Sequence, residues 1–491
     1  FYDNSEKLAT TATGIDVTGR AVVDGLTSTG ITDNATSTAL TIDSANRLNI
    51  GKSAAVTGNP VEIQANSAGG ALGIYGRASD SFSYLGFYAN GANTEYVSLR
   101  ASSSNDLTIK TGGADRLTIN STGIDVTGSV VADGLTVDGS IKLDGNYPTG
   151  TDNVALGNNA FSAALTGAGN IAIGDSASQN ITSGSNSIAI GRDAMQGIYT
   201  GGDTIAIGRS ALSALTSGSF NTALGALAIA SVTTNGGNTG VGAFALNQAT
   251  GANNTTLGFQ AGRYLTTADN NTALGYLAGG GTGVVTGDDN TSVGASAGLR
   301  LTSGARNTLI GTGAGDALTS GTENVALGHA ALSTNTLGQR AVAIGFYALN
   351  AQTNAAGVNT YNTAVGAMAG EKVTTGYNNT LIGGLAGDAI TTGHSNSVLG
   401  VSVLSSNTTG TYNIALGISA LQSNTTASFN TAVGSRVLVL NTIGANNTAS
   451  GYQAMFNNTT ASNNTALGYY ALYANTTGAS NVAIGALALD A

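Results

Sequence analysis

Asn271-Thr272-Ala273-Leu274-Gly275 is one copy of a pentapeptide that recurs twenty times between residue 153 and residue 491. Asn464-Thr465-Ala466-Leu467-Gly468 is a second clean copy, and an alanine lies three residues after the glycine in both, at Ala278 and Ala471. The closing glycines are residues 157, 174, 191, 208, 225, 242, 258, 275, 294, 311, 328, 345, 366, 383, 400, 417, 434, 451, 468 and 485. Sixteen of their nineteen spacings are 17 residues, so residues 151–491 repeat one structural unit.

This short period predicts a parallel β-solenoid. Helical repeats need about 33 residues or more to hold a helix pair, and Gly, Thr and Asn are poor helix formers. We expect each 17-residue unit to form one coil of two short strands and two turns, stacked on its neighbours to bury its apolar face. At about 4.8 Å per coil, the twenty coils give a rod on the order of 95 Å long.

Three columns of the repeat are nearly constant, and stacking turns such columns into ladders. The residue four before the glycine is Asn in seventeen repeats, the exceptions being Ser187, Thr204 and Ala341. The residue directly before the glycine is Ile, Leu or Val except at Ser450. We expect the Asn side chains to bond from coil to coil, the glycine to mark a positive φ or a close backbone approach, and the alanine to fill a tight inner position.

Three spacings depart from the period: 16 residues after Gly242, 19 after Gly275 and 21 after Gly345. We expect these coils to differ in a turn while the rod continues. Within the pentapeptide, alternate residues point to opposite sides of the strand. Asn and Ala suit the inside of a narrow roll, and the aliphatic set on the other side also favours burial. The pattern therefore predicts an elongated homotrimer, with three chains packed around an axis.

The first 150 residues form a different region. Residues 8–19 recur as residues 117–128, and alternating apolar and polar residues between glycine turns predict short strands. Residues 59–116 hold the densest aromatic cluster and four predicted strands. We predict an N-terminal β stalk over 1–58, a compact β domain over 59–116, a second stalk segment over 117–150 and the solenoid over 151–491. A stalk with aromatic decoration is the alternative for residues 59–116.

Composition excludes several functions. The chain of 491 residues has 72 Gly, no Cys, 9% charged residues and a net charge of −10, without a basic patch. Nucleic acid is therefore not an expected partner. No apolar run approaches the 18 residues of a membrane span, so membrane insertion is not expected.

The repeats resemble a known family. Asn-Ser-Ile-Ala-Ile-Gly at 186–191 and Asn-Val-Ala-Ile-Gly at 481–485 look like the head repeat of trimeric autotransporter adhesins of the YadA type. This resemblance covers about 340 residues and implies a left-handed parallel β-roll with three chains side by side. The coil is longer here than is usual in that family, so the handedness is only what the resemblance implies.

The front of the chain resembles a second group of proteins. Residues 112–123 and 136–141 are similar to segments of bacteriophage tail fibres, particularly marine ones. This resemblance implies a structural fibre on a virion. The alternatives are the passenger of a bacterial trimeric adhesin or a subunit of an extracellular filament. In either case, the implied partners are other copies of the chain and a host cell-surface glycan or protein.

Aromatic residues are the candidate binding residues. Tyr452, Tyr469, Tyr470 and Tyr473 gather in the last coils, where rings could stack on sugars of a cell surface or simply cover an apolar edge. We expect any binding to lie there or in residues 59–116, because selective recognition needs irregular residues. The column of threonines in the turns raises ice binding as a rival function, but its pattern looks interrupted at residues 165–167, 248–250 and 335–337.

No catalytic, cofactor or metal site is predicted, so we do not expect an enzyme. His329 and His394 are four repeats apart and are expected to be separate surface residues. Asp288 and Asp289 could touch a cation, although a polar turn is the simpler explanation. Residues 311–315 superficially resemble a nucleotide loop, but they lie in phase with the repeat and no Lys follows. The acidic residues of 151–491 share no column, which argues against glycoside hydrolysis.

Overall fold

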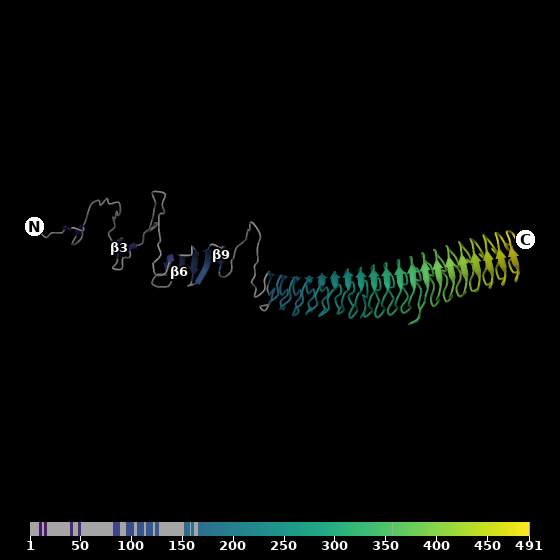
Figure 1. The fold of residues 1–491 in the computed structure, drawn as a ribbon, viewed down its shortest axis with the longest axis horizontal. Coiled ribbons are helices and arrows are strands. Elements are labelled where there is room, and N and C mark those ends of the chain that lie inside the picture. Colours follow the sequence, from purple (N-terminus) through teal and green to yellow (C-terminus); the bar gives the residue numbers. More distant parts are fainter. Residues whose placement is uncertain are drawn as a thin grey trace, which may run out of the picture. The chain divides into compact units, whose positions relative to one another are not determined.

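The computed structural model describes residues 9–11, 14–16, 40–42, 48–50, 82–88, 95–102, 106–111, 114–120, 123–126, 152–157, 159–161, 165–355 and 357–490. The chain divides into two units, residues 1–138 and 139–491, which we describe separately. Every helix or strand assigned to the described residues is a β-strand, which confirms the all-β class (Figure 1).

The second unit is a parallel β-solenoid whose twenty strands form one continuous sheet (Figure 1). The strands are β10 (Val154–Leu156), β11 (Ile171–Ile173), β12 (Ile188–Ile190), β13 (Ile205–Ile207), β14 (Thr222–Leu224), β15 (Thr239–Val241), β16 (Thr255–Leu257), β17 (Thr272–Leu274), β18 (Thr291–Val293), β19 (Thr308–Ile310), β20 (Val325–Leu327), β21 (Val342–Ile344), β22 (Thr363–Val365), β23 (Thr380–Ile382), β24 (Ser397–Leu399), β25 (Ile414–Leu416), β26 (Thr431–Val433), β27 (Thr448–Ser450), β28 (Thr465–Leu467) and β29 (Val482–Ile484). Each strand pairs in parallel with the next. The predicted solenoid is confirmed.

The sheet also continues through the irregular coils. Leu274 pairs with Val293 across the 19-residue spacing, and Ile344 pairs with Val365 across the 21-residue spacing. The pairing of β15 with β16 likewise spans the 16-residue spacing. The prediction that the rod continues through these coils is confirmed, because their length differences lie between the strands.

Each coil contains one strand, so the prediction of two strands per coil is wrong. The residues after each strand form a run of tight turns, and besides the closing glycine three positions have positive φ. With positions counted from the closing glycine as 0, positions +2 and −5 are left-handed in every coil, as at Ser210 (φ 56°) and Phe220 (φ 61°), and position +4 in every coil after the first, as at Leu212 (φ 51°). Residues with positive φ cannot belong to a regular strand. Backbone hydrogen bonds between coils still stabilise these turns, as between the Ser210 N–H and the Arg192 carbonyl at 2.9 Å.

The core is a narrow interior filled by five main columns. Asn at position −4, Ala at −2, Ala at +3, a mostly aliphatic residue at +4 and the residue directly before the turn threonine are buried in successive coils, for example Asn221, Ala223, Ala228, Ile229 and Val232. This arrangement confirms the predicted inner faces. Positions −3 and −1 point to the other side of the sheet and are partly or fully exposed in the chain, as at Leu257, which is 50% exposed.

The glycine column has both a positive φ and a close approach to the backbone of the next coil, the two reasons predicted for it. Gly275 has a φ of 131°, a conformation that residues with a side chain rarely adopt. A Cβ at this position would lie 2.7 Å from the carbonyl carbon and oxygen of Gly294 in the next coil. Gly468 shows the same arrangement against Gly485, with a φ of 142°. The backbone of each coil can therefore bend sharply at this glycine in direct contact with the backbone of the next coil.

The Asn column forms the predicted ladder and also supports the backbone. Asn413 is fully buried, and its side-chain oxygen accepts the backbone N–H of Asn430 at 3.0 Å. Its Nδ2 donates to Asn396 Oδ1 at 3.1 Å and to the Ala427 carbonyl at 3.0 Å. Asn271 and Asn464 have equivalent roles in their coils. The column thus satisfies buried polar groups that the corner would otherwise leave unpaired.

Ala386 tests the assignment of the interior. It lies at position +3 and is fully buried, so Ala386→Leu should overpack one coil and reduce the free energy of unfolding by about 1–3 kcal/mol. Thr391→Ser keeps the hydroxyl that donates to the Thr408 carbonyl and should be close to neutral. Thermal melts of the two variants compare these effects, and equal melting temperatures would contradict the assignment.

The described residues of the first unit form two two-stranded hairpins and a five-stranded antiparallel sheet. The hairpins pair β1 (Ala9–Thr11) with β2 (Gly14–Asp16) and β3 (Leu40–Ile42) with β4 (Leu48–Ile50). The sheet has the order β5 (Phe82–Tyr88), β6 (Glu95–Ser102), β7 (Leu107–Thr111), β8 (Ala114–Asn120) and β9 (Gly123–Val126). Three of the four strands predicted in 59–116 lie in β5 to β7, and the fourth, at 61–64, lies outside the described residues.

The sequence repeat of the first unit forms the same hairpin twice. In the first copy Ala9 pairs with Asp16 and Thr11 with Gly14. In the second copy the equivalent pairs are Thr118 with Asp125 and Asn120 with Gly123. The second copy is part of the sheet, so the sheet extends beyond the predicted limit at residue 116.

Candidate functional site

The four tyrosines of the last coils lie together and form the candidate site. Tyr452 and Tyr469 occupy position +1 of consecutive coils and stack with their ring centroids 5.8 Å apart. Tyr470 contacts both rings, at 5.8 Å and 4.4 Å, and lies 4.8 Å from Tyr473. Phe456 stacks on Tyr473 at 5.6 Å, and sequence reasoning missed it, although its spacing of 17 residues from Tyr473 was available as a signal.

The phenol groups of this cluster influence one another. Loss of solvation raises the pKa of Tyr470, and the neighbouring Tyr469 raises it further. The Tyr470 hydroxyl therefore remains a neutral donor and acceptor of hydrogen bonds at physiological pH. Tyr452 and Tyr469 are 41% and 52% exposed, so their rings are accessible to a ligand. The cluster offers apolar ring surface and uncharged hydroxyls, which are suited to binding rather than to proton transfer.

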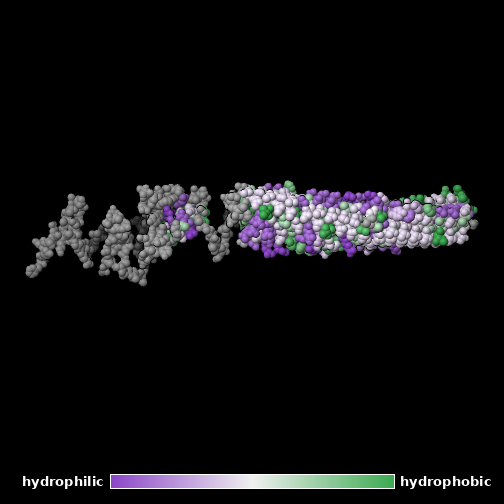
Figure 2. Space-filling model, turned by 90° about the horizontal axis from the view of Figure 1, so that it is seen from below, coloured by the Kyte–Doolittle hydropathy of each residue, from purple (hydrophilic) through white to green (hydrophobic). Residues whose placement is uncertain are grey.

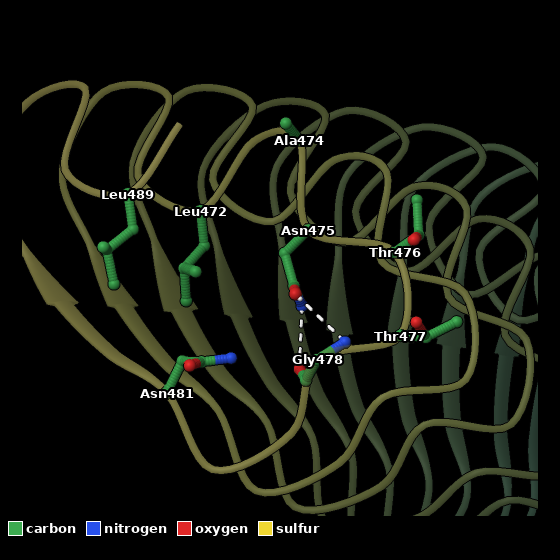
Figure 3. Close-up of a pocket in the computed structure, with 8 residues that line it drawn as sticks. All are labelled: Leu472, Ala474, Asn475, Thr476, Thr477, Gly478, Asn481 and Leu489. Atoms are coloured by element: carbon green, nitrogen blue, oxygen red, sulfur yellow. Dashed lines mark hydrogen bonds between the residues drawn. The ribbon is translucent and has the colours of Figure 1, made fainter. Parts of the chain in front are cut away.

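A cavity of about 370 Å³ lies at the C-terminal end of the solenoid (Figure 3). Leu472 and Leu489 face it, and the side chain of Asn475 forms two hydrogen bonds with the backbone of Gly478, at 3.0 Å and 3.1 Å. Figure 2 shows hydrophobic residues at this end of the rod and in further groups along it. The residues that line the cavity contain no titratable side chain, so the cavity offers no acid–base chemistry.

The two histidines lie in separate aromatic contacts. His329 stacks on Phe346 with centroids 5.5 Å apart, and His394 stacks on Tyr377 at 4.6 Å. His394 also contacts the ring of Tyr412 edge-on at 5.3 Å. Both histidines were predicted to be solvated surface residues; His329 is exposed and His394 is half-buried, and each ring also packs on an aromatic neighbour.

Asp288 and Asp289 accept hydrogen bonds from the preceding coil. An Asp288 carboxylate oxygen accepts the Asp269 N–H at 2.9 Å, and an Asp289 oxygen accepts from Asn270 Nδ2 at 3.2 Å. Among the described residues, no group of three His, Cys, Asp or Glu side chains could hold a metal ion. The glycines of residues 311–315 occupy positions 0, +2 and +4 of a coil, and all three have positive φ. Both motifs are explained by the geometry of the repeat.

The threonine column is continuous, contrary to its interrupted appearance in the sequence. A threonine follows the inward-facing residue of the turn in every coil from Thr166 to Thr476. At the three apparent gaps Thr166, Thr250 and Thr336 occupy the column, and only the second threonine of the turn is missing. The hydroxyls of the column donate to the carbonyl of the next coil, as from Thr425 to Thr442 at 3.0 Å. From Asn407 to Asn475 the inward residue itself forms a second Asn ladder that sequence reasoning missed. The threonine hydroxyls thus stabilise the stacking of successive coils.

Among the described residues, two aspartates in the turns of the solenoid have a buried carboxylate oxygen without a hydrogen-bond partner. These are Asp316 and Asp388, which both lie at position +5, and the buried oxygen is Oδ1 in each. Burial raises the pKa of both groups, although Arg300 lowers that of Asp316 and Lys372 that of Asp388. Four coils separate the two carboxyls, so they do not form a catalytic pair.

The raised pKa values of Asp316 and Asp388 predict that the free energy of unfolding depends on pH. A carboxyl whose pKa is raised by folding stabilises the fold below its unfolded pKa of about 4, and this contribution is lost as the pH rises through the folded pKa. We therefore expect Asp388→Asn to raise the melting temperature at pH 7 and to have little effect at pH 3. Asp316→Asn should behave in the same way. Thermal melts between pH 3 and pH 8 check this, and a difference that did not change with pH would contradict it.

Comparison of the chain with protein family models, with curated proteins and with solved structures gave no match. The described part of the chain also contains no helix with the length and hydropathy of a membrane span. The fold and its ladders nevertheless define a class, that of the parallel β-solenoid repeat proteins.

Proposed function

We propose that the protein is a structural fibre that provides reach and attaches to a host surface as a homotrimer, as a bacteriophage tail fibre does. The observation that carries this proposal is the outer face of the twenty-stranded sheet. Positions −3 and −1 of the twenty coils contain only Ile, Leu, Val, Thr and Ser, without a charged residue. In a sheet with one face in water, the residues on that face are normally polar or charged.

This face favours burial against other copies of the chain. Leu257 and Leu399 are each 50% exposed on it, and covering such surface contributes about 25 cal/mol per Å². A partner that covers twenty coils must repeat with the same spacing, and another copy meets that requirement. Three copies around an axis would cover the face along its whole length.

The first unit supports the same assembly. Leu85, Leu99, Ile109, Leu117 and Val126 are cross-strand neighbours on β5 to β9 and form one aliphatic row. Leu85 and Leu99 are 42% and 38% exposed in the chain. Packing of this row against other copies would bury apolar surface that one chain leaves in water.

Attachment is assigned to the tyrosine cluster of the last coils, with a cell-surface glycan or protein as partner. The remaining ladders repeat one small surface, which suits length and rigidity rather than selective recognition. In this proposal the protein has no catalytic role and belongs to a virion or to an extracellular surface. The alternatives are the passenger of a bacterial trimeric adhesin and a subunit of an extracellular filament, because an elongated β-solenoid would suit either role.

Sedimentation equilibrium tests the assembly. Wild type should sediment as a particle of three chains of 48.2 kDa each. Leu257→Lys with Leu399→Lys should dissociate it, because both lysines would lie on the apolar face. Thr409→Lys, at an exposed position on the threonine edge, is the matched control and should remain trimeric. A stable wild-type monomer would overturn the assembly.

A truncation after Gly434 tests the attachment. It removes the four tyrosines and should still give a soluble rod, because solenoid stability is close to a sum of nearest-neighbour terms. Adhesion to host cells should be lost or strongly reduced. Unchanged adhesion would exclude the last coils as an attachment site.

A further inference from the structure

Aromatic rings recur along one edge of the solenoid, directly after the glycine corner. Position +1 carries two stacked rings in three places along the rod: Phe259 with Tyr276, His329 with Phe346, and Tyr452 with Tyr469. Their centroids are 6.0, 5.5 and 5.8 Å apart, with interplanar angles of 9°, 20° and 16°. The tyrosine cluster of the last coils is therefore one of three similar arrangements.

Each stack ends in a ring with space beside one of its faces. The coil that follows each pair has alanine at position +1, namely Ala295, Ala367 and Ala486. Backbone hydrogen bonds place that coil next to the rings, as between the Leu487 N–H and the Tyr469 carbonyl at 2.8 Å. An alanine side chain cannot cover a ring. Tyr276, Phe346 and Tyr469 are accordingly 54%, 44% and 52% exposed.

A third ring at position +2 supports each pair. In the first arrangement Phe244 belongs to the coil before the pair and lies 6.2 Å from the inner ring, Phe259, edge-on. Tyr347 lies 4.3 Å from Phe346 in the second, and Tyr470 lies 4.4 Å from Tyr469 in the third. The rings are held by their neighbours before any ligand arrives, so binding would order few side chains. We call these three-ring arrangements the first, middle and last platforms.

The chemistry of the platforms suits a saccharide without net charge. The C–H face of a pyranose packs on the electron-rich face of an aromatic ring, and phenol hydroxyls bond to sugar hydroxyls. An anionic ligand would need opposing charges, but Arg436 is the only Asp, Glu, Lys or Arg in residues 389–489, where the last platform lies. In the first platform Arg263 lies over the ring of Phe244 at 5.2 Å, where it is already engaged.

We propose that the three platforms are equivalent binding sites for one repeating, uncharged polysaccharide, so that the rod binds along its edge as well as at its last coils. This inference rests on the proposed attachment function. The platforms lie four and seven coils apart, or about 19 and 34 Å at the spacing of stacked strands. Sites held at fixed distances on one chain bind a repeating ligand with an avidity that can exceed a single affinity by about 10²–10⁴.

Binding of the full chain to beads coated with mannan, dextran or galactan tests the proposal, with alginate as the anionic comparison. Tyr276→Ala, Phe346→Ala and Tyr469→Ala should each weaken binding to at least one neutral polysaccharide by about three- to tenfold, and the triple variant by at least about a hundredfold. Phe220→Ala removes an exposed ring at position −5 that stacks on no other ring of the described residues, and should bind like wild type. Thermal melts verify that all variants keep the rod.

Three results would overturn the inference. Loss of binding in Tyr469→Ala alone would confine attachment to the last coils and leave the proposed function intact. A preference for alginate would show that the ligand is anionic. Failure of wild type to bind any of the neutral polysaccharides would exclude the platforms as saccharide sites, whereas the sedimentation and cell-adhesion results would still decide the proposed fibre function separately.

Discussion

Gly383→Ala is expected to destabilise the solenoid strongly, whereas the same change at the neighbouring Gly384 should be harmless. Gly383 closes its coil with a φ of 131°, and an added Cβ would overlap the carbonyl oxygen of Gly400. The strained φ costs about 1–3 kcal/mol and the overpacking a similar amount. We therefore expect a loss of about 3–5 kcal/mol in the free energy of unfolding.

Gly384 is the matched control because it lies one residue further along the chain. A Cβ there would meet no heavy atom within 4 Å, and its φ is not in the left-handed region. Gly384→Ala should be neutral or stabilising by about 0.4–1 kcal/mol, since it restricts the unfolded chain. Urea denaturation of both variants, followed by circular dichroism, measures the difference. Equal midpoints would show that the corner does not require glycine.

Asn413→Ala is expected to have the next largest effect. It removes the side-chain oxygen that accepts the Asn430 N–H and leaves this buried donor unpaired, which costs about 1–3 kcal/mol. The Ala427 carbonyl keeps a bond from Asn424, so it is not left unpaired. Removal of the side chain also leaves a small cavity, which adds to this cost. We therefore expect a loss of about 2–4 kcal/mol in the free energy of unfolding.

Asn457→Ala provides the control for this variant, because Asn457 lies at position +6 and is only partly buried. It should change the free energy of unfolding by less than about 0.5 kcal/mol. Hydrogen exchange of the Asn430 amide would locate the effect of Asn413→Ala, since that amide should lose its protection first. Unchanged exchange at Asn430 would contradict the role assigned to the ladder. The repeat tolerates single gaps, because Ala341 occupies this position naturally.

Most of the solenoid could be predicted from the sequence because stacking places identical residues on one another. The period fixed which positions coincide, and the small residues Ala278 and Ala471 indicated the interior. The candidate site was found in part. Tyr452 and Tyr469 were recognised because they follow consecutive glycines, whereas Phe456 was missed because it stacks on Tyr473 from a variable position.

The sequence by itself therefore determined the all-β class, the number of coils, the inner columns at positions −4, −2 and +3 and the glycine corner, since each depends on residue size repeated at a constant spacing. Only the tertiary structure decided the path between the strands. Leu212, Phe220 and Arg306 adopt positive φ, which their residue types do not favour and which the bonds between stacked coils compensate. It also decided which rings end a stack, because an open face such as that of Tyr469 depends on the alanine in the next coil, 17 residues away in the chain.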